Sequence, residues 1–413
     1  MIKAALIGAG GRGKDVYADY ALKYPNEIQF VAVAEPNEHK RNEFVAKHNI
    51  ASDMVFDSWE KLLEKPKLCD AVFVCTQDKM HFQPAIKAIE KGYNILLEKP
   101  MSNNLKECIK IVEASKDHNS SITVAHVLRY TPFFKKLKQI IDSSIIGEVV
   151  NIDLNENVGY WHYAHSYVRG NWNNSETSSP MILAKSCHDM DILLWLVGKK
   201  PLKISSFGSL KYFKEKNAPK NSSDRCLDCA VEYECPYSAL KTYLVDSNEW
   251  PVSVISNDLS MEGRIKALKE GSYGKCVFRS SNNVVDHQVV NIEFEDDVTA
   301  AFTMSGFTNE MTRKIIIMGT LGEVTGDLDN NEVIVKLFGS GEEQHINVEN
   351  LFGGHSGGDT GLMKYYTRQL KDKVVEGLTS AEVSLLSHVM AFSAEQSRIT
   401  RQTIDLEEFV KSI

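Results

Sequence analysis

Short apolar runs alternate with amphipathic segments along the first 125 residues of the chain. The runs consist almost entirely of aliphatic and small residues, which is typical of strands buried on both faces of a sheet. The segments between them carry apolar residues at helical spacing. This alternation predicts a doubly wound, parallel α/β sheet. We predict strands at 3–7, 29–34, 70–75, 94–99 and 121–125, and helices at 38–47, 84–91 and 105–117.

After residue 125 the pattern changes. One amphipathic helix is predicted at 133–141 and another at 185–198, where a glycine ends it. From residue 284 onward apolar and polar residues alternate with a period of two, which indicates strands with one solvated face. We therefore predict two domains, residues 1–125 with the parallel sheet and residues 126–413 with an α+β fold around a large, mostly antiparallel sheet. The alternating strands are predicted at 289–294, 299–305, 313–318, 323–327 and 332–338, and a further strand at 147–154 follows the helix at 133–141.

Composition and charge narrow the class of protein. The 413 residues are 43% hydrophobic and 25% charged, which is ordinary for a globular chain. The formal net charge is −8 and no basic arm is present, so we expect no nucleic-acid partner. The apolar runs are too short to span a bilayer, and the first residues lack the layout of a signal peptide. We expect a cytoplasmic protein with no membrane partner.

The first predicted strand runs into a glycine-rich turn, and a helical pattern follows it. The turn reads Gly8-Ala-Gly10-Gly11-Arg12-Gly13. Gly8 permits a tight turn, Gly10 lets a pyrophosphate approach the backbone, and Gly13 lets the helix and the strand pack closely. Because this fingerprint sits between a strand and a helix, we predict a Rossmann domain whose helix N-terminus faces the phosphates of a dinucleotide.

The second predicted strand ends at Glu35, where an acidic side chain binds the ribose hydroxyls of NAD. A carboxylate at this place repels the 2′-phosphate of NADP, so Glu35 favours NAD. The side chains of Arg12 and Arg41 can soften this preference, and NADP stays open as a cofactor.

Two further loops follow the carboxyl ends of predicted strands. Thr76 and His81 belong to the loop after the strand at 70–75, and Glu98-Lys99 precede Pro100 at the end of the next strand. Ligands of open α/β sheets bind at this rim. The proline biases Lys99 toward an extended conformation. A surface ion pair is the plain alternative for Glu98 and Lys99.

These motifs, together with His188-Asp189-Met190-Asp191, resemble those of the glucose–fructose oxidoreductase / inositol dehydrogenase / rhizopine catabolism (Gfo/Idh/MocA) superfamily. The resemblance extends over nearly all of the chain. It implies a nicotinamide cofactor and a sugar or polyol substrate. It further implies that Lys99 and His188 serve in proton transfer, and that Thr76, His81, Glu98 and Lys99 contact the cofactor.

The predicted helix at 185–198 places Lys185, His188 and Asp191 three or four residues apart, so that several share a face. We predict His188 and Lys185 as catalytic residues and Asp191 as a substrate contact. The sequence departs from the family at one position. Many polyol dehydrogenases of the family carry an aspartate four residues before this histidine, where this chain has Ala184.

Other polar residues are candidates for substrate contacts. His126 and Arg129 lie on the predicted crossover between the domains, and Arg129 fits a plain salt bridge equally well. His165 and Arg169 belong to an aromatic segment that suits a sugar, with a protein interface as the alternative. His355 belongs to a glycine-rich loop that either returns to the site or simply begins a helix.

Three of the eight cysteines lie close together in a polar segment, residues 211–240, which lacks the apolar residues for a core. Their spacing is of a metal-binding type, and a zinc ion would staple such an insert. Free thiols or a redox pair are the alternative. The predicted ligands are Cys226, Cys229, Cys235 and, as the fourth, Cys187, ahead of His162 and His165.

Three functional hypotheses follow. The first is an NAD(P)-dependent oxidoreductase that transfers hydride between nicotinamide and a sugar or polyol, as a homodimer or homotetramer. The second is a glycosidase that keeps NAD bound, oxidises a sugar transiently and eliminates its substituent. The third is a non-catalytic regulator that binds NAD. Lys99 and His188 argue against the third.

Overall fold

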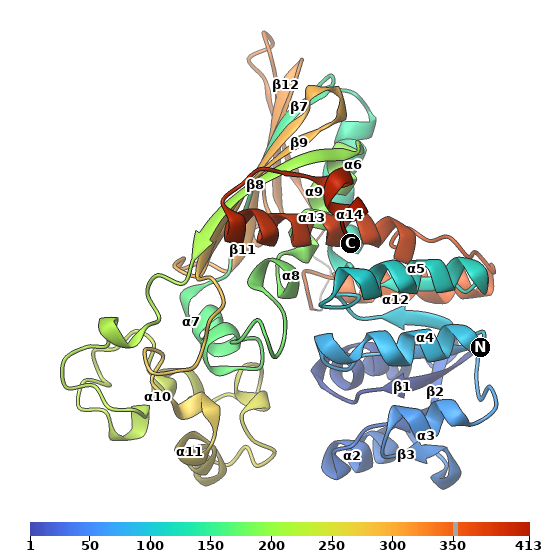
Figure 1. The fold of residues 1–413 in the computed structure, drawn as a ribbon, viewed down its shortest axis with the longest axis vertical. Helices are drawn as coiled ribbons and strands as arrows, with labels where there is room; N and C mark the ends of the chain where they lie inside the picture. The colour runs from blue at the N-terminus through green and yellow to red at the C-terminus, as the bar shows by residue number, and fades with distance from the viewer. Residues whose placement is uncertain (350–353) are drawn as a thin grey trace.

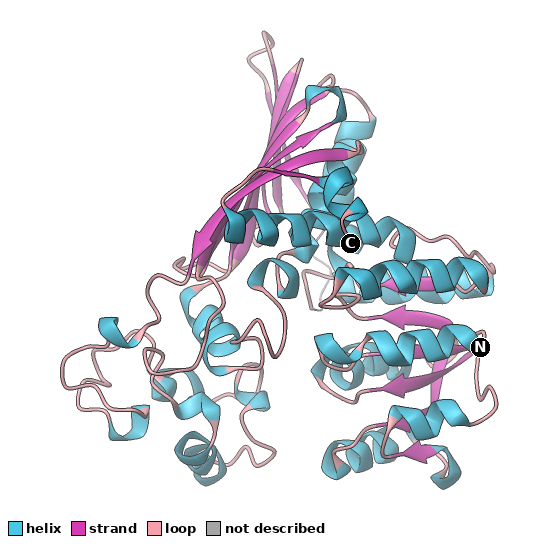
Figure 2. Cartoon of the chain, viewed as in Figure 1, coloured by secondary structure: helices cyan, strands magenta, loops and turns pink. Residues whose placement is uncertain are grey.

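The structure is a computed structural model that describes residues 1–349 and 354–413. A parallel sheet covered by helices, a large twisted sheet and an irregular lobe make up the molecule (Figure 1). The parallel sheet and the lobe lie beside each other below the large sheet, as the view coloured by secondary structure makes plain (Figure 2).

The first sheet has six parallel strands in the order β3-β2-β1-β4-β5-β6. This order reverses at β1 and β4, which is the Rossmann topology predicted from the sequence. The apolar runs are buried on both faces because helices cover both sides. The strands are β1 (Ile2–Ile7), β2 (Ile28–Ala34), β3 (Val55–Phe56), β4 (Ala71–Val74), β5 (Asn94–Leu97) and β6 (Ile122–Val124).

The second sheet has nine strands in the order β14-β13-β12-β11-β7-β10-β9-β8-β15. All its pairings are antiparallel except that of β7 with β10. The predicted mostly antiparallel sheet is confirmed, and β8, β14 and β15 were not predicted. The strands are β7 (Val149–Asn157), β8 (Pro201–Ser209), β9 (His287–Phe294), β10 (Thr299–Ser305), β11 (Thr312–Gly319), β12 (Gly322–Asp327), β13 (Glu332–Leu337), β14 (Glu343–Asn347) and β15 (Ile404–Asp405).

One face of the second sheet is covered by helices, including α6, α9 and α13. α9 ends at Gly198, whose φ of 68° is a left-handed conformation that suits glycine. The helices are α1 (Asp19–Lys23), α2 (Glu38–His48), α3 (Trp59–Glu64), α4 (Phe82–Glu90), α5 (Leu105–Asp117), α6 (Pro132–Asp142), α7 (Tyr160–Tyr163), α8 (Met181–Ala184), α9 (Cys187–Val197), α10 (Ala239–Tyr243), α11 (Met261–Glu270), α12 (Gly358–Lys371), α13 (Ala381–Thr400) and α14 (Leu406–Lys411).

The chain returns to the first sheet near its C-terminal end. Leu362, Met363 and Tyr366 of α12 belong to the apolar core of the parallel sheet. The Val124 N–H of β6 then donates to the Thr379 carbonyl at 2.8 Å, just before α13 begins. α12 and α13 therefore tie the two sheets together and bring the His355 loop beside the glycine turn.

The irregular lobe extends between β8 and β9, over about residues 210–286, and is longer than the predicted insert at 211–240. It contains only short helices. Its separate apolar cluster has four buried members, Cys226, Ala239, Tyr243 and Leu268.

Candidate functional site

The glycine turn after β1 has the geometry of a dinucleotide cradle. Gly8 has a φ of +91°, and a Cβ there would lie 2.7 Å from the Cys75 carbonyl oxygen. A Cβ at Gly13 would overlap the Gly8 carbonyl oxygen, whereas nothing lies within 4 Å of a Cβ at Gly10. Each glycine therefore has the role predicted from the fingerprint, and the open side at Gly10 leaves room for phosphates. A π-helical turn, Gly11–Ala18, begins the helix that follows.

Glu35 lies at the carboxyl end of β2 and is buried. Its Oε2 accepts from the Ala9 N–H at 2.8 Å, and its Oε1 accepts from the Asn37 N–H at 2.9 Å. The carboxylate is thus fixed beside the glycine turn, as binding to an adenosine ribose requires. Arg41 donates to the backbone carbonyls of Glu35 and Pro36, which holds its guanidinium close to the same place.

Arg12 links three parts of the chain rather than pointing at the ribose. Its guanidinium donates to Glu98 at 2.7 Å, to Asp359 at 2.7 and 3.0 Å, and to the Tyr17 hydroxyl at 2.6 Å. Burial, the largest single effect, raises the pKa of Glu98 and of Asp359, but Arg12 together with Lys99 and Tyr17 at Glu98, and with His355 at Asp359, lowers both pKa values overall. Both carboxylates therefore stay ionised and lock the glycine turn to the β5 rim and to α12.

Lys99 reaches from the rim of the first sheet to the second half of the chain. Its Nζ donates to the Ala184 carbonyl oxygen at 2.7 Å, at the end of α8. Two histidines support the turn that carries it. The ring nitrogens of His81 lie 2.6 Å from the Pro100 carbonyl oxygen and 3.0 Å from that of Thr76, and His388 Nε2 accepts from the Met101 N–H at 2.9 Å.

His188 lies in the first turn of α9, four residues after Ala184, and is buried. Neither of its ring nitrogens has a hydrogen-bond partner among the residues that the structure describes. Its ring centroid lies 5.9 Å from that of His126 and 5.7 Å from that of His355. Burial lowers the pKa of His188 well below its usual range, and the Lys99 charge lowers it further. The imidazole is therefore neutral and has a free acceptor nitrogen.

Unpartnered polar atoms gather around this histidine. The Thr76 hydroxyl, the Ser186 hydroxyl and the His126 Nδ1 are also buried without a hydrogen-bond partner in residues 1–349 and 354–413. Buried polar atoms almost always have partners, and exceptions call for a ligand or water. The junction of the two sheets therefore offers several unused donors and acceptors beside Lys99.

A buried chain of alternating charges lies next to His188. Lys185 Nζ lies 3.5 Å from Glu156 Oε1, Glu156 contacts Arg313, and Arg313 Nε donates to Asp189 at 2.7 Å. Burial lowers the pKa of Lys185, and Glu156 opposes this shift. Glu156, Arg313 and His388 were not predicted as site residues from the sequence. The strand pattern carries a signal for the first two, because both occupy inward-facing positions, in phase with buried aliphatic residues.

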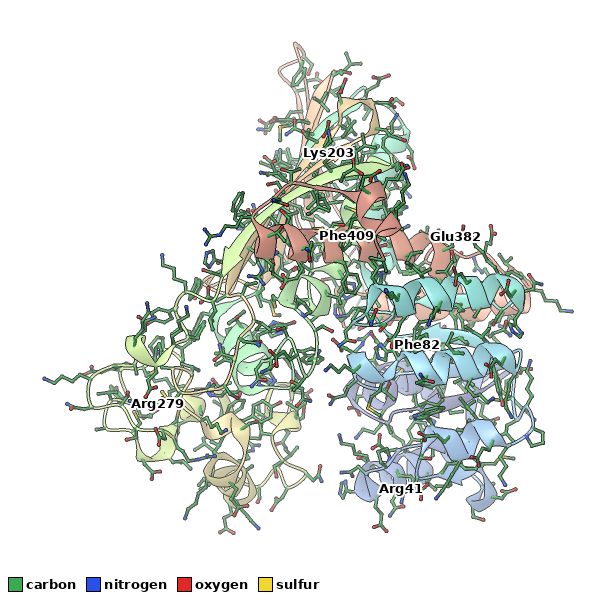
Figure 3. All side chains as sticks on the ribbon, viewed as in Figure 1. Arg41, Phe82, Lys203, Arg279, Glu382 and Phe409 are labelled. Carbon is green, nitrogen blue, oxygen red and sulfur yellow. The ribbon has the colours of Figure 1, made fainter. Side chains whose placement is uncertain are left out.

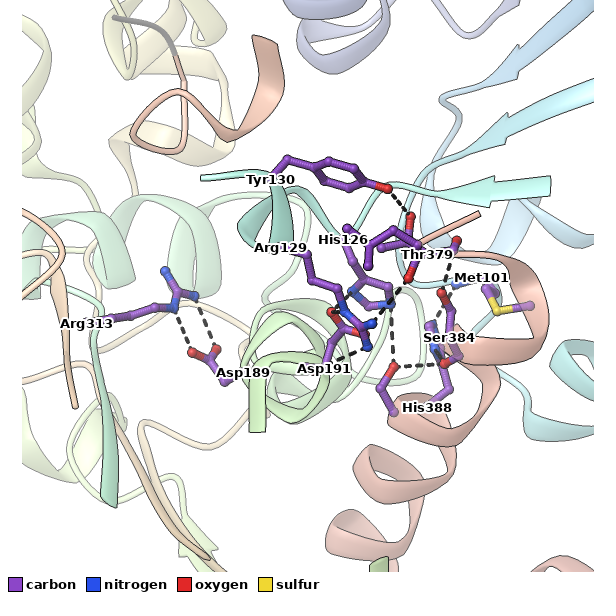
Figure 4. A network of polar contacts seen from close by, with 12 residues as sticks. Met101, His126, Arg129, Tyr130, Asp189, Asp191, Arg313, Thr379, Ser384 and His388 are labelled. Atoms are coloured by element: carbon purple, nitrogen blue, oxygen red, sulfur yellow. Dashed lines mark hydrogen bonds and ion pairs between the residues drawn. The ribbon is translucent and has the colours of Figure 1, made fainter. Parts of the chain in front are cut away.

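Arg129 and Asp191 form the plain salt bridge that the sequence allowed as an alternative. The Arg129 Nε and NH2 groups each donate to an Asp191 oxygen at 2.7 Å, and both side chains are buried (Figure 4). His126 Nδ1 lies 3.9 Å from the same carboxylate, and its ring faces that of His388 at 5.6 Å. Arg129, Asp191, His126 and His388 form a cluster next to His188. The cluster links the crossover segment between the domains to α9 and α13.

His165 and Arg169 lie at the base of the lobe. The His165 Nδ1 is 2.8 Å from the Tyr243 hydroxyl, and its ring stacks on Tyr273. Arg169 donates to the carbonyls of Lys275 and Tyr237 and to Cys226. The structure thus gives both residues contacts that anchor the base of the lobe, and their role as substrate contacts stays a prediction.

The loop that carries His355 lies close to His188. This is one of the two alternatives that the sequence allowed, the other being a plain helix start. His355 Nδ1 lies 3.1 Å from Asp359 Oδ2, and Asp359 in turn binds Arg12. The His355 ring therefore lies between the glycine turn and His188.

The predicted zinc site with Cys187 as its fourth ligand is not confirmed. Cys187 is buried in the main core at the start of α9 and does not line the cavity that Cys226, Cys229 and Cys235 share. Within residues 1–349 and 354–413, no three or more His, Cys, Asp or Glu side chains are arranged to hold a metal ion. All eight cysteines are free thiols.

A six-stranded Rossmann sheet with a glycine cradle, joined to a large open sheet, defines the class of NAD-binding oxidoreductases. Two family models match the chain. The "Oxidoreductase family, NAD-binding Rossmann fold" matches residues 2–126, and the "Oxidoreductase family, C-terminal alpha/beta domain" matches residues 138–383. The chain belongs to this Gfo/Idh/MocA oxidoreductase family.

Several curated relatives are similar in sequence. The oxidoreductase YteT of Bacillus subtilis is 24% identical over 323 residues, which are 75% of this chain and 74% of YteT. The 2,7-anhydro-N-acetylneuraminate hydratase of Escherichia coli is 24% identical over 210 residues, 50% of this chain and 53% of the hydratase. The inositol 2-dehydrogenase of Ralstonia nicotianae is 26% identical over 198 residues, 48% of this chain and 55% of the dehydrogenase. The chain thus spans about half the length of the last two.

Solved structures share the fold over the whole chain. An oxidoreductase domain protein from Kribbella flavida has a TM-score of 0.73 at 14% identity, covering 98% of this chain and 99% of its own. An oxidoreductase from Agrobacterium radiobacter, in complex with NAD+, L-tartaric acid and magnesium, has a TM-score of 0.72 at 14% identity, covering 99% of both chains. Among the described residues, no helix has the length and apolar character needed to cross a membrane.

Proposed function

We propose that the protein is an NAD-dependent oxidoreductase that acts on a hydroxyl-bearing carbon of a sugar or polyol. Residues 1–125 bind the dinucleotide, and residues 126–413 supply the substrate side of the site. One observation carries the proposal. The Lys99 amine is held against the helix turn that leads to His188, and both His188 nitrogens are unused.

The protein groups suit the removal of a proton from a hydroxyl. NAD, when bound, supplies the acceptor for the hydride. The neutral His188 has a free nitrogen that can accept the hydroxyl proton, and Lys99 has two further N–H groups to hold the substrate oxygen. Lys185 and His355 border the same place and orient the substrate.

The cofactor side of the site supports NAD as the preferred dinucleotide. The Glu35 carboxylate is fixed by two backbone N–H groups and cannot swing away from the ribose. A 2′-phosphate would therefore be desolvated against a fixed negative charge. Arg41 offsets only part of this repulsion, because its NH1 group is spent on the Glu35 and Pro36 carbonyls.

A second function is favoured by the environment of Ala184. Position 184 is an alanine, so no carboxylate there helps the His188 imidazole to take a proton. Lys99 binds the backbone carbonyl of Ala184. An enzyme of this design can oxidise a sugar carbon transiently, eliminate a neighbouring substituent and return the hydride, with no net consumption of NAD. Similarity to a named hydratase supports this alternative.

A homodimer or homotetramer is proposed through the open face of the second sheet. Phe207 pairs with Val289 across β8 and β9, and Ile316 of β11 lies on the same face. These three side chains are 57%, 40% and 39% exposed. Large apolar side chains on one solvated sheet face are typical of an interface.

The test is a thermal-shift screen of NAD, NADP and a panel of sugars and polyols, followed by NADH fluorescence on the hits. With a substrate in hand, Lys99→Met should lower kcat about 10²–10⁴-fold while NAD still binds. Lys106→Met, an exposed lysine at the start of α5, is the matched control and should keep full activity. Full turnover by Lys99→Met contradicts the proposal, and product release without NADH would favour the eliminating enzyme.

A further inference from the structure

The lobe brings a fourth cysteine to the three that are clustered in sequence. One cavity of about 20 Å³ is lined by Cys226, Cys229, Cys235 and Cys276. Cys276 follows Cys235 by 41 residues, so no local spacing indicates it. Cys187, the fourth ligand predicted from the sequence, does not line this cavity.

Backbone contacts fix the segments that carry these four thiols. The Cys276 N–H donates to the Asp224 carbonyl at 2.8 Å, and Arg225 and Lys275 form an antiparallel bridge. Cys226 and Cys276 are therefore neighbours on two adjoining segments. The Cys229 N–H donates to the Cys226 carbonyl at 3.3 Å, which closes a turn over the Cys-x-x-Cys sequence.

Two arginines donate to sulfur atoms of the cluster. The Arg169 NH2 group lies 3.4 Å from Cys226 Sγ, and Arg169 is only 3% exposed. The Arg279 NH1 group lies 3.9 Å from Cys276 Sγ, and Arg279 is labelled on the lobe in Figure 3. The two guanidinium groups place positive charge beside the cluster, which suits ligands that carry negative charge once a metal is bound.

Some lobe residues, such as Phe213 and Phe278, belong to the main core, but the segments around α10 and α11 have little core of their own. Their helices are short, and their separate apolar cluster has four buried members. Segments with so small a core usually need a disulfide or a metal ion. All four thiols of the cavity are free, so a disulfide does not serve this purpose.

We propose that Cys226, Cys229, Cys235 and Cys276 bind one Zn²⁺ ion that cross-links the segments of the lobe. Zn²⁺ displaces the thiol protons to solvent, with no change of oxidation state, and takes four sulfur ligands in a tetrahedron. As the side chains stand, the described residues present no ready-made arrangement for a metal ion. Binding therefore turns the thiols inward about their Cα–Cβ bonds. Cys229 and Cys235, which are only partly buried, have the most room to turn.

The site lies away from the proposed chemistry, and its role is structural. Arg169 connects the cluster to the segment that follows α7, so the metal would also fix the base of the lobe next to His165. Burial raises the pKa of the Cys235 thiol, and zinc offsets this shift because a coordinated thiol loses its proton outright.

Metal analysis of the full-length protein tests this proposal and uses no substrate. Protein expressed with added zinc and purified under reducing conditions should hold about one zinc per chain. Cys276→Ser should lose that zinc, whereas Cys187→Ser, a change in a buried cysteine outside the cavity, should retain it. Loss of zinc in Cys187→Ser but not in Cys276→Ser overturns the assignment.

Cobalt provides a second readout in case the Cys276→Ser variant does not fold. Chelator-treated wild-type protein should take up one Co²⁺ and show the intense visible absorption of a tetrahedral thiolate site, which added Zn²⁺ then abolishes. Wild-type protein that takes up neither zinc nor cobalt contradicts the proposal. Iron with acid-labile sulfide in place of zinc also contradicts it.

Discussion

At the scale of single residues, the site depends on side chains that fix the backbone turn after Lys99. His388 accepts from the Met101 N–H and donates through Nδ1 to the Ser384 carbonyl at 2.7 Å, so its tautomer is fixed (Figure 4). The ring is buried, and its protonation would cost the Met101 hydrogen bond. The histidine is therefore a positioning residue for Lys99.

Replacement of His388 tests this contact. His388→Phe leaves the buried Met101 N–H without an acceptor, which should lower the free energy of unfolding by about 1–3 kcal/mol in urea titrations. The exposed His118 offers the matched control, and His118→Phe should stay within about 0.5 kcal/mol of wild type. Equal stability of the two variants would argue against a stabilising role for the hydrogen bond between Met101 and His388.

We expect Glu35 to decide between the two dinucleotides. Glu35→Gln removes the charge but keeps the size of the side chain, so binding of NADP should improve relative to that of NAD. We expect the ratio of Kd for NADP to Kd for NAD to fall about 10-fold or more, since 1.4 kcal/mol corresponds to a factor of ten. Fluorescence titration with each cofactor measures this, with the exposed Glu38→Gln as control. An unchanged ratio would show that Glu35 does not face the ribose.

Residue roles were predictable from the sequence only where a motif fixes the backbone. The glycine turn, Glu35 and Lys99 follow from their places at strand ends, because parallel strands bring those ends to one edge. The contacts of Arg169 and His165 with the lobe were not predictable, because their partners lie far away in the sequence. Partners that are distant in sequence, such as Cys276 for Cys226, leave no local pattern.

At the scale of elements, buried ion pairs connect the crossover and the second sheet to α9. Arg129 and Asp191 join the crossover segment to α9, and Arg313 of β11 pairs with Asp189 of the same helix. Both aspartates are almost fully buried, at 1% and 0% exposure. α9 is thus held from two sides, which fixes the direction of His188 in its first turn.

The Arg129–Asp191 pair allows a clean double-mutant test. Arg129→Leu strands the buried Asp191 charge and should cost about 3–5 kcal/mol of stability, whereas Arg129→Leu with Asp191→Leu should recover much of the loss. Lys61→Leu, which breaks the exposed pair with Asp57, should change stability by less than about 1 kcal/mol. A double variant as unstable as the single one would contradict the interpretation.

Periodicity predicted most elements but not their edges or their partners. The strands β9 to β13 follow from their alternation, whereas β8 was missed because its burial pattern is irregular. The insert was predicted to end at residue 240, whereas the lobe continues through α11 to β9. Contacts between α12 and the parallel sheet depend on a chain return that no local pattern encodes.

At the scale of the whole molecule, the two halves are joined by a core rich in buried, neutral histidines. Burial lowers the pKa of His165 to about 4 and that of His388 to about 3, and it places those of His126, His162 and His188 well below the usual range. In the unfolded chain each titrates near 6.5. Protons therefore bind the unfolded state first as the pH falls.

This difference predicts a loss of stability in mild acid. Below about pH 6.5 the free energy of unfolding should fall by about 1.4 kcal/mol per pH unit for each histidine that stays neutral, until the folded pKa is reached. Most carboxylates titrate only below about pH 4.5, so histidines dominate between pH 6.5 and 5. Melting temperatures measured from pH 7.5 to 5 should decline throughout the acidic part. A flat profile would contradict burial of neutral histidines.

The two-domain architecture was predictable as a whole because the hydrophobic pattern differs between the two halves. The first half has continuous apolar runs, and the second half has strands in which apolar and polar residues alternate. The relative placement of the two halves was not predictable, since it depends on Arg12, Asp359 and the return of α12. The site forms at this junction, where Lys99 of one sheet meets the helix turn before His188.

The central claim is that Lys99 and His188 act on the same hydroxyl beside the dinucleotide. A double-mutant cycle of kcat on the substrate found by screening, with Lys99→Met, His188→Phe and both together, tests it most directly. If the two side chains act as one unit, the double variant should be no slower than the slower single variant. Losses that multiply, or a single variant with wild-type kcat, would show that the two groups do not share the reacting atom.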